Sequence, residues 1–132
     1  MRKTNNHTRI ELSRFVPPTG VCEYQAMIHI TSPELDFEQQ LAALLDACHH
    51  LRENELHGAR AVFERYFLSD AANQTQYLLD ALTACPACSR SIVEQPPLDG
   101  SKIALWVYLQ TGAVPLSFLG YQSGHALNRY TR

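Results

Sequence analysis

The chain has 132 residues, 45% of them hydrophobic, which is enough for one domain, over 1–132, with a single apolar core. Eleven basic and thirteen acidic residues give a formal net charge of -2, so no general electrostatic attraction to nucleic acid is expected, although a local basic patch stays open. Every apolar run is well short of the roughly 20 residues that a transmembrane helix needs. No membrane span is therefore expected.

The first part of the chain predicts two strands. Residues 1–18 form a polar N-terminal segment. Within it, polar and apolar residues alternate weakly over 8–15, as in an edge strand, and Pro17 and Pro18 end this strand. Residues 21–30 have the β-branched and aromatic content of a second strand. Its polar residues Glu23, Gln25 and His29 share one parity, so this face is expected to point outward or into a site.

A helix is predicted next, because Asp36 and Gln39 have the spacing of a capping box. After them, apolar residues recur at three- and four-residue steps and form one stripe of an amphipathic helix that ends near 53–58. The stripe consists of Phe37, Leu41, Leu44, Leu45, Cys48 and Leu51.

The second half predicts a strand over 59–68, a shorter helix over 73–82, and a hairpin over 88–109. In the first of these strands, the alternation places residues 59, 61, 63, 65 and 67 on one face. The tail over 113–132 mixes aromatic residues with glycines and is not assigned a structure. The expected fold is α+β, with a single sheet and two helices packed on one of its faces.

The hairpin over 88–109 carries the main functional signal. A short strand contains Arg90, a Pro-Pro-Leu-Asp-Gly turn follows, and the strand over 103–109 is apolar on both faces. The pattern predicts a permanent cation beside an apolar wall, which suits a small anion. Because two helices can cover only one face of the sheet, the other apolar face predicts a closed homo-oligomer.

The four cysteines are expected to be reduced thiols in a cytoplasmic protein, because nothing resembling a secretory signal precedes them. Cys85 and Cys88 have the spacing of a redox pair or of half a zinc site. The chain offers no second pair of this spacing, and Cys85 follows a predicted helix instead of opening one. Neither a metal site nor a cofactor is expected.

These segments resemble the RidA (YjgF-type, endoribonuclease L-PSP-like) family over roughly 20–110. The resemblance is carried by the Gln-rich helix start at 36–40, by Pro86-Ala87-Cys88-Ser89-Arg90 with two residues inserted before the arginine, and by the stretch 97–103. It implies a chorismate-mutase-like fold, a homotrimer, and ligand clefts between subunits. It also implies that Arg90 is the arginine that holds the substrate carboxylate. Where hydrolytic members have acidic residues in the last strand, this chain has Ala104 and Trp106.

Five residues are candidates for ligand binding: Arg90, Trp106, Tyr108, Tyr24 and His29. The guanidinium of Arg90 matches a carboxylate with two parallel hydrogen bonds, although an ion pair with Glu64 or Glu94 is the alternative. Trp106 and Tyr108 share one parity and could line a site or fill a core or interface. Tyr24 and His29 belong to a strand expected near the same cleft, where the histidine could transfer protons or serve only a structural role.

The first functional hypothesis is therefore a small carboxylate-bearing metabolite bound at each subunit interface. The alternative is a hydrolase or deaminase acting on enamine or imine intermediates, or on a chorismate-like enol ether, with Glu94, His29 or the tail supplying an acid or a held water. The third hypothesis is that the protein is a purely structural or regulatory partner of another molecule. Annotations of the family as endoribonucleases imply an RNA-facing surface, which the charge of this chain does not support.

Overall fold

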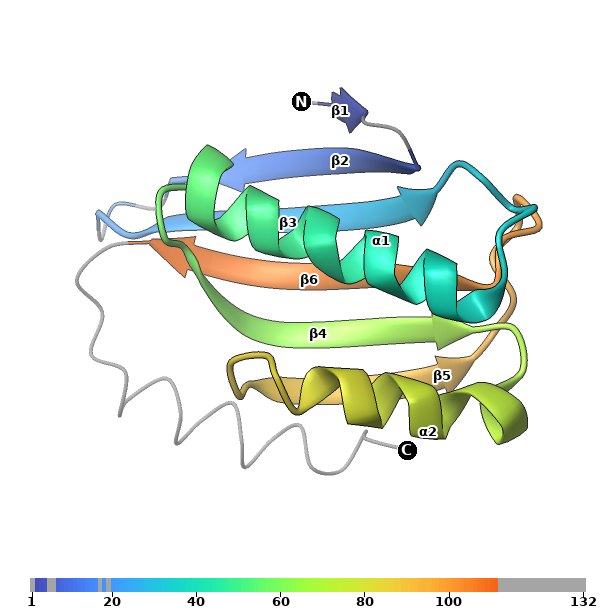
Figure 1. The fold of residues 1–132 in the computed structure, drawn as a ribbon. Helices are drawn as coiled ribbons and strands as arrows, with labels where there is room; N and C mark the ends of the chain where they lie inside the picture. Colours follow the sequence, from blue (N-terminus) through green and yellow to red (C-terminus); the bar gives the residue numbers. More distant parts are fainter. Residues whose placement is uncertain (1, 5–6, 17, 19, 112–132) are drawn as a thin grey trace.

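The computed structural model describes residues 2–4, 7–16, 18 and 20–111, which form one six-stranded sheet with two α-helices on one face (Figure 1). The predicted α+β class, with a single sheet and helices on one side, is confirmed. None of the helices in this part of the chain is long and apolar enough to cross a membrane. The tail over 113–132 lies outside the described residues.

The elements are β1 (Arg2–Thr4), β2 (Thr8–Phe15), β3 (Cys22–Ile30), α1 (Phe37–His50), the π-helical turn η1 (Leu51–Glu55), β4 (Arg60–Leu68), α2 (Ala71–Leu82), β5 (Ser89–Glu94) and β6 (Ile103–Thr111).

The strand order is β1-β2-β3-β6-β4-β5, with β4 and β5 parallel and all other neighbours antiparallel. The predicted hairpin over 88–109 is therefore wrong, because β4 lies between β5 and β6. The chain from β5 to β6 passes across the end of β4, where Gln95 N donates to Leu68 O at 2.9 Å and Ser69 N donates to Lys102 O at 3.0 Å. The parallel β4–α2–β5 crossover brings β5 beside β4 at the edge of the sheet, which leaves β6 to pair on the other side of β4.

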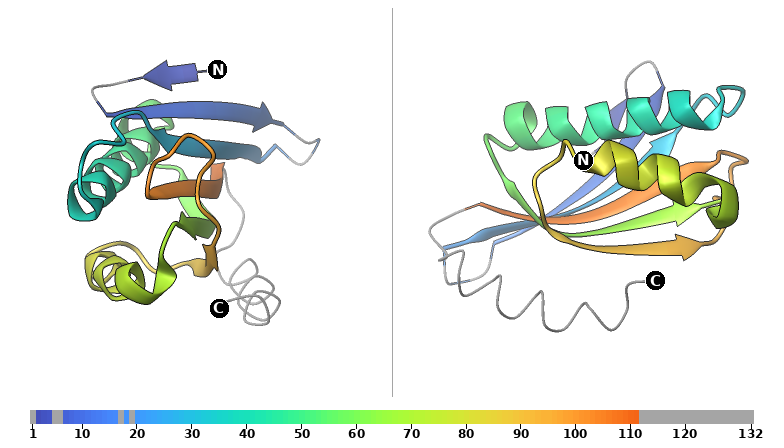
Figure 2. Two further views of the ribbon diagram at one scale, coloured as in Figure 1. Left: turned by 90° about the vertical axis from the view of Figure 1, so that its right-hand side faces the viewer. Right: turned by 60° about the horizontal axis from the view of Figure 1, so that its bottom comes forward.

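The start of α1 is the predicted capping box. Gln39 N donates to Asp36 Oδ1 at 2.8 Å, and Asp36 N donates to Gln39 Oε1 at 3.1 Å. The helix packs on β2, β3 and β6, whereas α2 packs on β4 and β5 (Figure 2). α2 begins at Ala71, two residues before its predicted start, and Glu94 Oε1 accepts the backbone N–H of Ala71 at 3.1 Å. Glu94 therefore helps to cap α2.

The two faces of the sheet differ in what covers them. Ile103, Leu105, Val107 and Leu109 of β6 are fully buried within the core under the helices. Ala104, Trp106 and Tyr108 alternate with them and point to the opposite face, which no described helix covers and which we call the open face. β6 is therefore apolar on both faces, although described helices cover only one of them.

A bulge in β4 changes the predicted pattern of that strand. Ala61 pairs with Leu109 and Phe63 pairs with Tyr108, so Val62 is an extra residue opposite β6. Ala61 therefore lies on the helix-covered face, and only Phe63, Arg65 and Phe67 lie together on the open face. The prediction that alternate residues over 59–67 share one face is therefore wrong at the start of the strand, because the inserted Val62 inverts the alternation there.

Candidate ligand-binding site

The five predicted site residues do not come together. Arg90 pairs with Glu64 across β5 and β4, on the helix-covered face. Tyr24 pairs with Leu109 and lies on the same face, but β3 and β5 are three strand spacings apart, about 14 Å. Trp106, Tyr108 and His29 lie on the open face. The sheet therefore separates Arg90 from the aromatic residues that were expected beside it.

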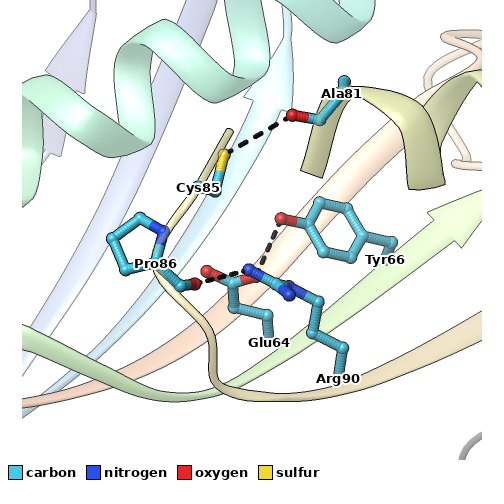
Figure 3. A network of polar contacts seen from close by, with 6 residues as sticks. All are labelled: Glu64, Tyr66, Ala81, Cys85, Pro86 and Arg90. Carbon is cyan, nitrogen blue, oxygen red and sulfur yellow. Dashed lines mark hydrogen bonds and ion pairs between the residues drawn. The ribbon is translucent and has the colours of Figure 1, made fainter. Parts of the chain in front are cut away.

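Arg90 is part of a partly buried polar network (Figure 3). Its Nε donates to Glu64 Oε1 at 2.8 Å, and its guanidinium also donates to the backbone oxygen of Pro86 at 2.7 Å. The hydroxyl of Tyr66 donates to the same Glu64 oxygen at 2.9 Å, and Glu64 is only 6% exposed. Burial alone would lower the pKa of Arg90, but Glu64 raises it. Of the two roles left open by the sequence, the structure shows the ion pair with Glu64, and a ligand-binding role of Arg90 stays a prediction.

Two thiols near this network, those of Cys48 and Cys88, are not activated. Burial, followed by the nearby charge of Glu64, raises the pKa of both Cys48 and Cys88 to about 12. Both are therefore protonated at neutral pH and are poor nucleophiles. The four cysteines are unpaired, and no three metal-ligating side chains gather within the described residues.

Arg65 is a candidate site residue that was not among the five predicted from the sequence. It lies on the open face of β4, opposite Trp106 of β6. Its Cζ is 5.3 Å from the ring centroid of Phe63, and the rings of Phe63 and Trp106 meet edge to face at 5.8 Å. Within the described part of the chain Arg65 makes no ion pair, and its Nε is buried without a hydrogen-bond partner. An uncompensated cation beside aromatic rings is a suitable place for an anion.

The sequence contained a signal for this residue. Phe63, Arg65 and Phe67 alternate on one face of a strand, so a single cation stands between two aromatic side chains. The alternation could not show whether a carboxylate of a neighbouring strand pairs with Arg65.

A pocket of about 370 Å³ lies beside Arg65 on the same face, between the sheet and the 95–99 segment. Its sheet side is a row of residues paired across four strands: Arg9, His29, Ala104 and Phe67. Arg9 forms an ion pair with Glu11, and His29 Nε2 lies 3.8 Å from Glu11 Oε1. His29 Nε2 is buried and makes no hydrogen bond in the described structure. This pocket brings His29 near the open-face residues but not near Arg90.

Comparisons with known proteins do not assign the chain. No family model matches it, and no curated protein matches it significantly.

Proposed function

We propose that the protein binds a small carboxylate-bearing molecule on the open face of its sheet, with Arg65 as the anchor. The observation that carries the proposal is the guanidinium of Arg65, which has a buried Nε and no acidic partner in the described structure. A guanidinium can hold a carboxylate with two parallel hydrogen bonds. Phe63 and Trp106 exclude water from one side of this cation, which strengthens its attraction for an anion.

Arg65 is a better anchor than Arg90 on energetic grounds. A ligand that took over the guanidinium of Arg90 would displace Glu64, a carboxylate that is only 6% exposed. Leaving such a carboxylate buried without its partner costs several kcal/mol, about 3–5 in measured cases. Binding at Arg65 breaks no ion pair of the described structure.

The expected assembly fits the same face. Trp106 and Tyr108 are partly exposed on the open face, where no described helix covers them. A second copy of the chain would bury these rings and enclose a ligand held by Arg65. We therefore extend the proposal to a RidA-like, chorismate-mutase-like homotrimer with its ligand between subunits.

The hydrolase or deaminase alternative depends on His29. Glu94, another candidate acid, already accepts the backbone N–H of Ala71 at the start of α2. His29 lies on the open face, in the pocket beside Arg65, and its Nε2 has no hydrogen-bond partner in the described structure. It is the described residue best placed to accept a proton from a molecule bound on this face.

Fluorescence of Trp106 tests the proposal, because Trp106 is the one tryptophan of the chain. Titration with 2-oxobutyrate is expected to change the emission in a saturable way, whereas butyramide, which has no carboxylate, is expected to have little effect. The Arg65→Ala variant should lose the change. An unaltered titration of this variant would rule out Arg65 as the anchor.

A further inference from the structure

The lining of the pocket beside the 95–99 segment contains one carboxylate, the solvent-exposed side chain of Asp99. Asp99 Oδ1 accepts both the backbone N–H of Ser101 at 3.1 Å and its hydroxyl at 2.7 Å. Among the other described residues, only Ser101 forms hydrogen bonds with this carboxylate, both to Oδ1. Burial would raise the pKa of Asp99, but the hydrogen bonds from Ser101 and the nearby charge of His29 outweigh it and lower the pKa. Asp99 is therefore ionised at neutral pH.

In the described structure, Asp99 forms no ion pair with another residue of the pocket. Arg9 is the one arginine or lysine in the pocket lining, and its guanidinium is already paired with Glu11. Asp99 is the one carboxylate in that lining and has no ion pair in the described structure. The pocket thus has no arginine or lysine that pairs with Asp99 in the described structure, and a ligand cation could take that place.

The rest of the pocket is apolar. The side chain of Ala104 lies on its sheet side and is 2% exposed, while Leu98 at the rim is fully exposed to solvent. Met27, Phe67, Pro96 and Pro97 complete the apolar lining. A volume of about 370 Å³ is within the range of small-molecule sites. The pocket therefore suits a compact ligand with an apolar body and one polar end.

We propose that this pocket binds small molecules that combine an apolar body with a protonated amine, whose ammonium group donates to Asp99 Oδ2. The apolar body would lie against Ala104, Met27 and Phe67. A carboxylate at the same point would be repelled by Asp99, so this pocket differs from the anion site at Arg65. Its ligand chemistry does not depend on the proposed function.

The test is a titration followed by NMR, with benzylamine as the probe and benzyl alcohol and benzoate as neutral and anionic analogues. Benzylamine is expected to shift the backbone resonances of 97–101. Benzyl alcohol should bind roughly tenfold more weakly or worse, because it cannot form a hydrogen bond between two charges. Asp99→Asn should weaken the binding of benzylamine by a similar factor. Asparagine keeps an oxygen acceptor for Ser101, and thermal unfolding of the variant checks that the turn persists.

Two control variants make the outcome specific. Asp46→Asn makes the same chemical change at an exposed position on α1 and should leave benzylamine binding unaltered. Arg65→Ala should also leave it unaltered, which separates this pocket from the carboxylate site. The proposal is overturned if benzylamine fails to bind the wild type, if benzoate binds more tightly, or if Asp99→Asn binds benzylamine as well as the wild type does.

Discussion

Arg90 Nε donates to Glu64 Oε1 at 2.8 Å, on the face of the sheet that α1 and α2 cover. Arg90→Ala would leave the carboxylate of Glu64 without a charged partner. This is costly because Glu64 is almost fully buried. We expect the variant to lose about 3–5 kcal/mol of unfolding free energy in urea. Arg60→Ala, at the start of β4, removes an arginine that has no ion pair in the described structure and should cost much less. Equal losses in the two variants would contradict this structural role.

Stability at alkaline pH should depend on Cys48. Burial raises the pKa of its thiol from 9.0 to about 12, so the folded state holds this proton more tightly than the unfolded chain does. The resulting stabilisation is complete below pH 9.0 and is lost as pH rises towards about 12. Within this range, the ionisation of Cys48 should lower the free energy of unfolding by about 1.4 kcal/mol per pH unit.

Urea unfolding across this alkaline range checks the role of Cys48. Cys48→Ala should remove part of the dependence on pH, relative to its own stability at neutral pH, because Cys88, with a pKa also raised to about 12, keeps its own contribution. Cys22→Ala should not flatten it, because the hydrogen bond with Arg14 lowers the pKa of the Cys22 thiol. An unchanged slope in Cys48→Ala would show that other groups control alkaline unfolding.

The two faces of β6 should respond differently to a charge. Leu105 is fully buried under the helices, so Leu105→Asp should unfold the protein. Trp106→Asp should retain the circular dichroism of the fold, because its side chain lies on the partly exposed open face. If copies of the chain meet through this face, light scattering should show a trimer for the wild type and a smaller species for Trp106→Asp. A wild-type monomer would contradict the proposed assembly.

The capping box of α1 gives a local prediction. Asp36→Ala removes the acceptor of the Gln39 backbone N–H and should lower stability by about 1 kcal/mol. Asp46→Ala, at an exposed position inside the helix, should have little effect or a slightly favourable one. Thermal unfolding of both variants measures the difference, and equal shifts would mean that the cap contributes little.

The local features of the fold could be predicted from the sequence. Alternation indicated β2, β3 and β4 within a residue or two, and the spacing of Asp36 and Gln39 indicated the start of α1. The order of the strands could not be predicted in this way. Whether β5 pairs with β6 or with β4 is decided by packing between segments distant in the chain, and the observed order overturned the hairpin.

The candidate site was harder to predict for the same reason. The face on which Arg90 lies depends on its register against β4, which pairs it with Glu64. This register is set by pairing between segments that are distant in the chain, so the local sequence pattern could not predict it. Arg65 was correctly placed beside Phe63 and Phe67 by alternation. Its lack of an acidic partner depends on β5 and β6, whose positions the sequence did not reveal.

The most direct test compares the two arginines by isothermal titration calorimetry with 2-oxobutyrate. Arg65→Ala should cost roughly 2 to 5 kcal/mol of binding free energy, because the carboxylate loses its charged partner in a partly dry site. Arg65→Lys keeps the charge but lacks the planar fork, so it should recover only part of the affinity. Arg90→Ala, measured on the folded fraction, should bind as the wild type does. Loss of binding in Arg90→Ala together with unchanged binding in Arg65→Ala would contradict the account and make Arg90 the anchor.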